Sequence, residues 1–236
     1  MKGFDKMNKN FYIVVDTETA NGYLDDRGKF CLDDSLVYDI GWSICDKKGN
    51  IYKTVSLIIS ETFNNKDLMN SAYYADKLPQ YYDSIVNRTR RVVNIMQAKV
   101  MFERDCREYN VKAICAHNAR FDLNALNTTI RYYTKSKCRY FFPYGIEIWD
   151  TLKMCDVIAN QKCYKRFCEE NGYMTKHKTP RVRKTAEILY RYITFNNDFV
   201  ESHTGLEDTK IEVAILAHCF RQHKKMRKLL FEPKTA

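Results

Sequence analysis

Short runs of hydrophobic residues alternate along this chain with longer segments in which hydrophobic positions recur at helical spacing. Residues 11–16, 36–45 and 50–59 are predicted to be strands, and the polar stretch 47–50 predicts a hairpin turn between the last two. Residues 111–116 and 145–149 predict two further strands, each followed by a helical pattern. This order predicts an α/β fold, in which a mixed β-sheet is flanked by α-helices.

Helical spacing dominates the remaining segments. Residues 60–110 are expected to be mainly helical, with one apolar face formed by positions 92, 93, 96, 100 and 102. Residues 151–171 predict one helix that Gly172 ends. Residues 1–10 are polar, and we expect a disordered leader there. The predicted folded domain therefore spans residues 11–220, and a basic C-terminal tail spans 221–236.

Composition narrows the class of protein. The 236 residues are enough for one α/β domain with a sizeable core. Lys and Arg number 39 against 29 Asp and Glu, a formal charge of +10, which suits a polyanionic partner but also favours solubility. The nine Cys contain no C-x-x-C pair, which favours a reduced, cytoplasmic setting. No stretch approaches the about 18 apolar residues of a membrane span, so no membrane partner is expected.

The first candidate site is Asp16-Thr17-Glu18, at the end of the hydrophobic run 11–15. Residues two apart in a strand point to the same face, so the two carboxylates are expected to converge. Such charges repel unless a cation lies between them, and Mg²⁺ and Mn²⁺ take oxygen ligands. The alternative is a pair of ordinary surface carboxylates where a strand meets a loop.

The second candidate is His117-Asn118-Ala119-Arg120-Phe121-Asp122, directly after the predicted strand 111–116. Asp122 is expected in the first turn of a helix, where the helix dipole favours an anion. A structural role is therefore open to Asp122, and Asn118 could be only a helix cap. Phe121 is equally compatible with the core, and His117 with a satisfied histidine at a strand end.

The third candidate is His203-Thr204-Gly205-Leu206-Glu207-Asp208, which leads into the last predicted helix. Asp208 is expected near the start of that helix and His203 on the loop before it, with Gly205 letting the loop fold back. His203 could be a surface residue or a cap. It could also be a general base, because an unperturbed histidine has a pKa of about 6.5.

Together these three segments resemble the DEDDh branch of the ribonuclease-H-like 3′–5′ exonucleases, which includes the proofreading subunit of bacterial DNA polymerase III, RNase T and oligoribonuclease. Tyr38-Asp39-Ile40-Gly41-Trp42 is similar to the second strand of that family, and Trp149-Asp150-Thr151-Leu152 to its strand-to-helix junction. The match runs from about residue 11 to 220. Many members continue the first motif with Thr-Thr-Gly-Leu, whereas this chain has Thr19-Ala20-Asn21-Gly22.

The resemblance implies a role for each matched residue. Asp16, Glu18 and Asp208 would hold one divalent ion, Mg²⁺ or Mn²⁺. Asp16 would bridge to a second ion, on which Asp122 acts through water, and His203 would take the proton of the attacking water. The positions that match the pocket for the last nucleotide are Thr19, Ala20, His117, Asn118 and Phe121.

The function expected from the sequence is a two-metal-ion 3′–5′ exonuclease that acts on single-stranded 3′ ends, with DNA favoured. The alternatives are an RNA-trimming exoribonuclease and a catalytically inactive nucleic-acid-binding module. The resemblance leaves a polymerase partner and the oligomeric state open. The basic residues Arg181, Arg183 and Lys184 are the predicted contacts to the substrate backbone. A second basic stretch, Arg88-x-Arg90-Arg91, is the alternative, although a helix with a buried face and a solvated face is the commoner explanation of such a pattern.

Overall fold

A mixed six-stranded sheet forms the centre of the computed structural model, which describes residues 10–21, 23–24, 30–31, 34–72 and 75–231. The strand order is β6-β5-β4-β1-β7-β8. β4 pairs antiparallel with both β1 and β5, whereas the pairs β5–β6, β1–β7 and β7–β8 are parallel. The strands are β1 (Phe11–Ala20), β4 (Leu36–Asp46), β5 (Ile51–Ile59), β6 (Arg91–Val93), β7 (Val111–Ala116) and β8 (Glu147–Asp150), and a separate two-stranded sheet pairs β2 (Tyr23–Leu24) with β3 (Phe30–Cys31).

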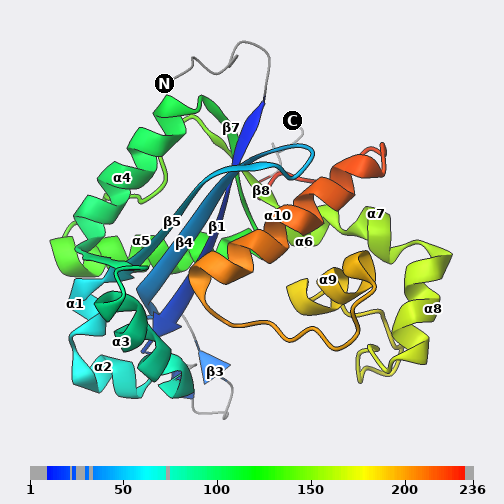
Figure 1. Ribbon diagram of the computed structural model, residues 1–236, viewed down its shortest axis with the longest axis horizontal. Helices are drawn as coiled ribbons and strands as arrows, with labels where there is room; N and C mark the ends of the chain where they lie inside the picture. Colours follow the sequence, from blue (N-terminus) through cyan, green and yellow to red (C-terminus); the bar gives the residue numbers. More distant parts are fainter. Residues whose placement is uncertain (1–9, 22, 25–29, 32–33, 73–74, 232–236) are drawn as a thin grey trace.

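Helices cover both faces of the sheet, which confirms the predicted α/β architecture (Figure 1). α4 (Ile95–Glu108) and α5 (Ala119–Thr134) pack on one face, and α10 (Gly205–Arg221) packs on the other. The remaining helices of the α10 side are α6 (Thr151–Met154), α7 (Asp156–Ala159), α8 (Lys162–Glu170) and α9 (Ala186–Thr194). The connection from β5 to β6 holds α1 (Ser60–Phe63), α2 (Lys66–Asn70), η1 (Ala75–Lys77) and α3 (Leu78–Val86).

Two helical predictions are wrong in detail. Within residues 60–110, the segment Arg91–Val93 is an edge strand, so Val92 is 43% exposed instead of sharing one helix face with Val93. Val100 on α4 is also 57% exposed, while Phe102 is fully buried. The single helix predicted over 151–171 consists of three short helices, α6, α7 and α8. Helical spacing does not show where such turns interrupt a helix.

The predicted hairpin turn is present between β4 and β5. The backbone amide of Gly49 donates to the carbonyl of Asp46, and the amide of Asp46 donates to the carbonyl of Asn50. Gly49 has a φ of +89°, a conformation that favours glycine. The predicted leader lies outside the described residues except for Asn10. None of the helices in the described ranges is both long and apolar enough to cross a bilayer.

The segment after α10 does not leave the domain. The amide of Asp150 donates to the carbonyl of Lys228 at 2.7 Å, and the amide of Leu230 donates to the carbonyl of Ile148 at 2.8 Å. Leu230 is buried in the same core as α4 and α5. Residues 228–230 of the predicted tail therefore add to the β8 edge of the sheet.

A close backbone contact positions α10 on the sheet. A Cβ atom placed on Gly41 of β4 would lie 2.3 Å from the backbone carbonyl carbon of Gly205. Only glycine allows this approach, since any side chain would push α10 away from the sheet. Gly41 pairs with Asp16 of β1. The contact therefore brings the start of α10 beside the end of β1, where the predicted carboxylates lie.

Candidate active site

Three of the predicted acids converge at this junction. Asp16 and Glu18 lie on β1 and Asp208 in the first turn of α10, and one carboxylate oxygen of each lies within 4.8 Å of the other two. Asp16 is intermediate in exposure, while Glu18 and Asp208 are buried. Oxygen ligands at this separation suit a hard divalent cation. The carboxylates are thus not the dispersed surface acids that the alternative interpretation of the first motif allowed.

Asp122 lies close to this group without being part of the converging trio. Its carboxylate accepts a hydrogen bond at 2.9 Å from the hydroxyl of Thr17, the residue between Asp16 and Glu18. The charge of Asp122 contributes to raising the pKa of both Asp16 and Glu18. The structure therefore brings together all four acids that the sequence motifs singled out.

Burial and mutual repulsion raise the pKa values of these carboxyl groups. Burial is the largest cause in each, and it holds the pKa of Asp16 well above its ordinary range. The pKa of Glu18 is raised to about 9, with repulsion from Asp39 and Asp208 added to burial, and that of Asp208 to about 8. For Asp122 burial outweighs the hydrogen bond from Thr17 and raises the pKa to about 7. A bound cation would relieve this repulsion, because it favours the ionised form of each ligand.

Two further carboxylates flank the site, and the sequence motifs missed both. Glu212 is one helical turn beyond Asp208 on α10, it is 3% exposed, and both its oxygens lie 3.2 Å from the backbone amide nitrogen of His117. Glu201 precedes α10, and its charge adds to the rise of the Asp208 pKa. Burial raises the pKa of Glu201 itself to about 7. The i, i+4 spacing from Asp208 was the available signal for Glu212, since such residues share a helix face.

His203 lies on the loop that precedes α10, as predicted. Its Nδ1 atom is 3.9 Å from a carboxylate oxygen of Glu201, and its backbone φ is +54°. Burial is the main cause that lowers the pKa of His203, which keeps the imidazole neutral to a lower pH. The neighbouring Ser202 hydroxyl donates to Asp208 at 3.4 Å. The loop that carries His203 is therefore bonded to the acidic group.

The residues of the second motif divide between core and surface. Both ring nitrogens of His117 are bonded within the protein, Nδ1 with the Thr151 hydroxyl at 3.0 Å and Nε2 with the Lys184 carbonyl at 2.7 Å. These bonds fit the alternative of a satisfied histidine at a strand end, whereas the substrate contact of His117 stays a prediction. Asn118 has a φ of +70°, makes no side-chain cap and is exposed, and with the half-buried Phe121 it lines an open groove.

The other predicted substrate contacts lie in different environments. Thr19 and Ala20 are buried at the end of β1, and Ala20 packs in a cluster with Tyr38 and Phe63. Arg181 and Arg183 are exposed.

Lys184 is already engaged, because its ammonium group pairs with Asp156 at 2.7 Å and donates to the carbonyl of Leu152 at 3.1 Å. Its predicted contact to a phosphate would require breaking this ion pair.

Arg90, one of the alternative phosphate contacts, belongs to a buried network next to the site. Its guanidinium donates to Asp39 at 2.9 Å and to Glu207 at 2.8 Å, and it lies over the ring of Tyr81. The same oxygen of Asp39 also accepts from the Tyr81 hydroxyl at 2.8 Å and from the Gly205 amide at 2.9 Å. This network joins the start of α10 to β4, so Arg90 has a positioning role: it holds these two elements together.

Comparison with known proteins supports the fold. No protein-family model matches the sequence, and no curated protein matches it. A crystal structure of a full-length 3′-exonuclease superimposes with a TM-score of 0.54 at 11% identity, covering 93% of this chain and 85% of that chain. The crystal structure of cell-death related nuclease 4 gives a TM-score of 0.51 at 11% identity, with 92% of this chain matching 66% of that longer chain. The predicted ribonuclease-H-like fold is therefore confirmed.

Proposed function

We propose that this protein is a metal-dependent 3′–5′ exonuclease that hydrolyses single-stranded nucleic acid and releases 5′-nucleotides, with DNA as the favoured substrate. The observation that carries the proposal is the convergence of Asp16, Glu18 and Asp208, whose ligand oxygens lie within 4.8 Å of one another. Among the described residues, no Lys or Arg forms an ion pair with any of these three acids. A site of this kind suits divalent cations, and Mg²⁺ and Mn²⁺ are the proposed ions.

The chain's own residues would divide the chemistry among them. Asp16, Glu18 and Asp208 would hold one ion, and Asp16 and Asp122 would serve a second. The two ions would together supply charge neutralisation at the phosphate and an activated water. His203 would accept the proton of the attacking water, and its lowered pKa keeps it in the neutral form that this role needs. Exposed Arg181 and Arg183 are the proposed contacts to the substrate backbone.

The test is an exonuclease assay on DNA and RNA of matched sequence, labelled at either the 5′ or the 3′ end, with Mg²⁺ or Mn²⁺. A 3′-labelled strand should release labelled mononucleotide at once, whereas a 5′-labelled strand should shorten as a ladder. EDTA and a 3′-phosphate block should each abolish the reaction. If neither DNA nor RNA is hydrolysed although both are bound, the protein is an inactive binding module. Faster hydrolysis of RNA than of DNA would identify an exoribonuclease.

A further inference from the structure

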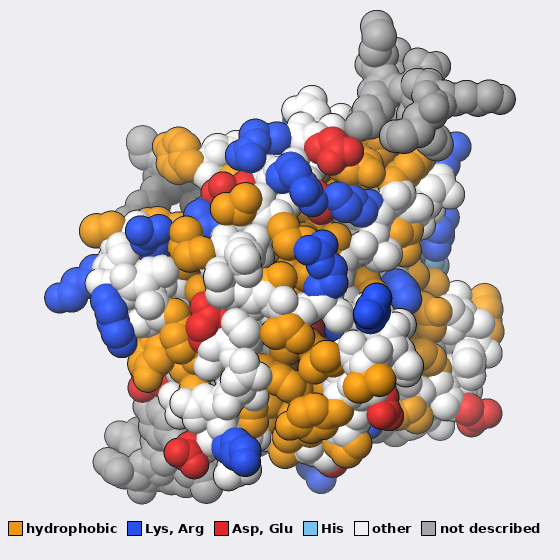
Figure 2. Space-filling view, turned by 60° about the vertical axis from the view of Figure 1, so that its left-hand side comes forward, with side chains coloured by type: hydrophobic (Ala, Val, Ile, Leu, Met, Phe, Trp, Pro, Cys, Tyr) orange, Lys and Arg blue, Asp and Glu red, His pale blue; other side chains and the backbone are white. Residues whose placement is uncertain are grey.

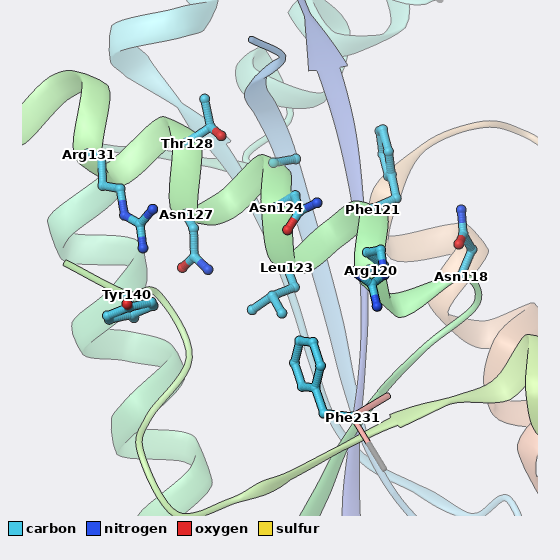
Figure 3. A pocket seen from close by; sticks show the side chains of 11 residues that line it. Asn118, Arg120, Phe121, Leu123, Asn124, Asn127, Thr128, Arg131, Tyr140 and Phe231 are labelled. Atoms are coloured by element: carbon cyan, nitrogen blue, oxygen red, sulfur yellow. The ribbon is translucent and has the colours of Figure 1, made fainter. Parts of the chain in front are cut away.

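An open groove runs along the outward face of α5, beginning at the second motif. Its volume is about 630 Å³, and residues of α5, Tyr140 from the connection to β8 and Phe231 from the C-terminal segment line it (Figure 3). Arg120 and Phe121 line one end of this α5 groove and Arg131 the other (Figure 3). We propose that the α5 groove binds the single strand upstream of the 3′-terminal nucleotide, an inference that rests on the proposed exonuclease function.

The first argument is the charge of the lining. Among the described residues that line the α5 groove, two are Arg and none is Asp or Glu. The rest of the polar lining is neutral, and it includes the amides of Asn124 and Asn127. This composition is the opposite of the neighbouring site, where carboxylates gather. A polyanionic strand is attracted to such a basic surface, and Arg is suited to phosphate.

The second argument is the pairing of cations with aromatic rings. The guanidinium of Arg120 lies 5.6 Å from the ring centroid of Phe231, and that of Arg131 lies 4.7 Å from the centroid of Tyr140. Both rings remain well exposed, Tyr140 at 60% and Phe231 at 59%. Exposed aromatic rings beside Arg form stacking platforms for unpaired bases without selecting their sequence. The combination favours a single strand over a duplex, whose bases are already stacked.

The third argument is that the lining is fixed in place by the fold. Arg131 donates through Nε to the carbonyl of Arg139 at 2.9 Å, and Asn127 accepts from the amide of Phe141 at 2.9 Å. These bonds hold the connection that carries Tyr140 against α5. Phe231 follows the residues that pair with β8, so the sheet positions it as well. A preformed surface binds with less loss of conformational entropy than a disordered one.

The dimensions of the groove set the length of strand that it can hold. Arg120 and Arg131 are eleven residues apart, which is about 16 Å along an α-helix. At about 3.4 Å per stacked nucleotide, this distance holds about five nucleotides. Asn118 and Phe121 belong both to the groove lining and to the motif that carries Asp122, so the groove begins where the terminal nucleotide is expected.

The experiment measures affinity as a function of strand length in the catalytically disabled Asp16→Asn background. Oligothymidylates of two to ten nucleotides should bind more tightly as they lengthen, by at least about tenfold in total, and the gain should level off at about six. Arg120→Ala with Arg131→Ala should remove most of this gain and leave the affinity for the dinucleotide within about twofold. Lys165→Ala with Arg166→Ala, which removes two exposed charges on α8, should keep the full gain.

Arg120→Lys with Arg131→Lys separates charge from stacking. This variant should keep the salt dependence of binding but lose part of the length gain, because an ammonium group does not stack like a guanidinium. An unchanged length dependence in the double Ala variant would overturn the proposal, as would its loss only in Arg181→Ala with Arg183→Ala. Hydrolysis by the unmodified protein is measured in parallel. If no strand is hydrolysed, the proposed function fails, whereas the binding series still decides the role of the groove.

Discussion

Buried carboxylates occupy two kinds of environment in this protein. Asp39 and Asp105 are fully buried, and each has a cationic partner: Asp39 pairs with Arg90, and Asp105 pairs with Lys53 at 2.7 Å and accepts from the Trp42 indole at 3.0 Å. Burial raises the pKa of Asp39, but Arg90, Tyr81 and Gly205 oppose that rise.

The carboxylates of the candidate site differ, because their main charged neighbours are other carboxylates. A buried charge without a partner is strongly unfavourable, and a chain that only had to fold would have no use for several of them together. We infer that Asp39 and Asp105 serve the fold itself, whereas Asp16, Glu18 and Asp208 form a site that a bound cation would complete.

The largest expected effect is the loss of exonuclease activity when an acid of the site is neutralised. Asp16→Asn or Asp208→Asn should lower the exonuclease rate by about 10³-fold or more, because ion binding contributes several kcal/mol to the transition state. The metal-free protein should at the same time become more stable, since the substitution removes a repelling charge. Rates and thermal unfolding are measured side by side, with Asp67→Asn on the exposed side of α2 as the control. A parental rate in Asp16→Asn would show that the site is misassigned.

Removal of Arg90, the partner of Asp39, should instead lower the stability of the protein. Arg90→Ala leaves Asp39 buried and unpaired, so we expect a loss of about 3–5 kcal/mol in the free energy of unfolding. Arg90→Lys should restore only part of it, since one ammonium group cannot reproduce the fork that joins Asp39 to Glu207. Denaturant unfolding measures the difference. Arg91→Ala, at an exposed position on the adjacent strand, serves as the control and should change stability by less than about 0.5 kcal/mol. Equal stability of both variants would contradict the positioning role of Arg90.

The next effect concerns the proposed base. His203→Ala should lower turnover by about 10²–10⁴-fold with little change in substrate affinity. Because burial lowers the pKa of His203, the rate should fall only below the ordinary titration range of histidine. Single-turnover rates across pH test both statements. His223→Ala is a matched control, since that residue is exposed and shares a positive φ of 51°. An unaltered rate in His203→Ala would leave this residue with a loop-capping role.

The last expected effect is on stability as a function of pH. The acids of the site have pKa values raised to about 7, 8 and 9 for Asp122, Asp208 and Glu18, so the folded metal-free protein binds more protons than the unfolded chain above pH 4. Its stability should therefore decrease as the pH rises from about 5 to 9.

Divalent ions should reverse that decrease, because they favour the ionised carboxylates. Thermal unfolding with EDTA and with Mn²⁺ at several pH values measures both trends. Asp16→Asn should flatten the pH dependence, whereas Asp67→Asn should leave it unchanged. Stability that rises with pH in EDTA would contradict the repulsion assigned to this site.

The sign of the surface charge also differs from that of the candidate site. Lys and Arg side chains outnumber Asp and Glu in the upper half of the face shown in Figure 2. In contrast, the acids Glu18, Asp122, Asp208 and Glu212 are buried at or beside the candidate site. Basic surface on a protein with an acidic site suits the delivery of a polyanion to bound cations.

Local sequence patterns were sufficient to locate the main strands and the residues of the acidic site. Short hydrophobic runs such as 11–15 and 111–116 predict strands buried in a sheet, and this pattern is contained in a few consecutive residues. Asp16 directly follows the first run, and Asp122 lies in the first turn of the helix that follows the second. The order of the motifs along the chain, through its resemblance to a nuclease family, singles out Asp16, Glu18, Asp122 and Asp208. Their convergence also requires the close approach of Gly205 to Gly41, which places the start of α10 beside the end of β1.

Tertiary contacts, in contrast, determine which polar residues are free to act. Arg90 and Lys184 have the sequence pattern of solvent-exposed cations, but Asp39 and Asp156 from distant segments pair with them. His117 is satisfied by Thr151 and by the Lys184 carbonyl, and Phe231 reaches α5 because residues 228–230 join the β8 edge. These contacts join residues far apart in the chain, and no local pattern encodes them. The physical reason is that a side chain's availability depends on its partners, which folding alone brings together.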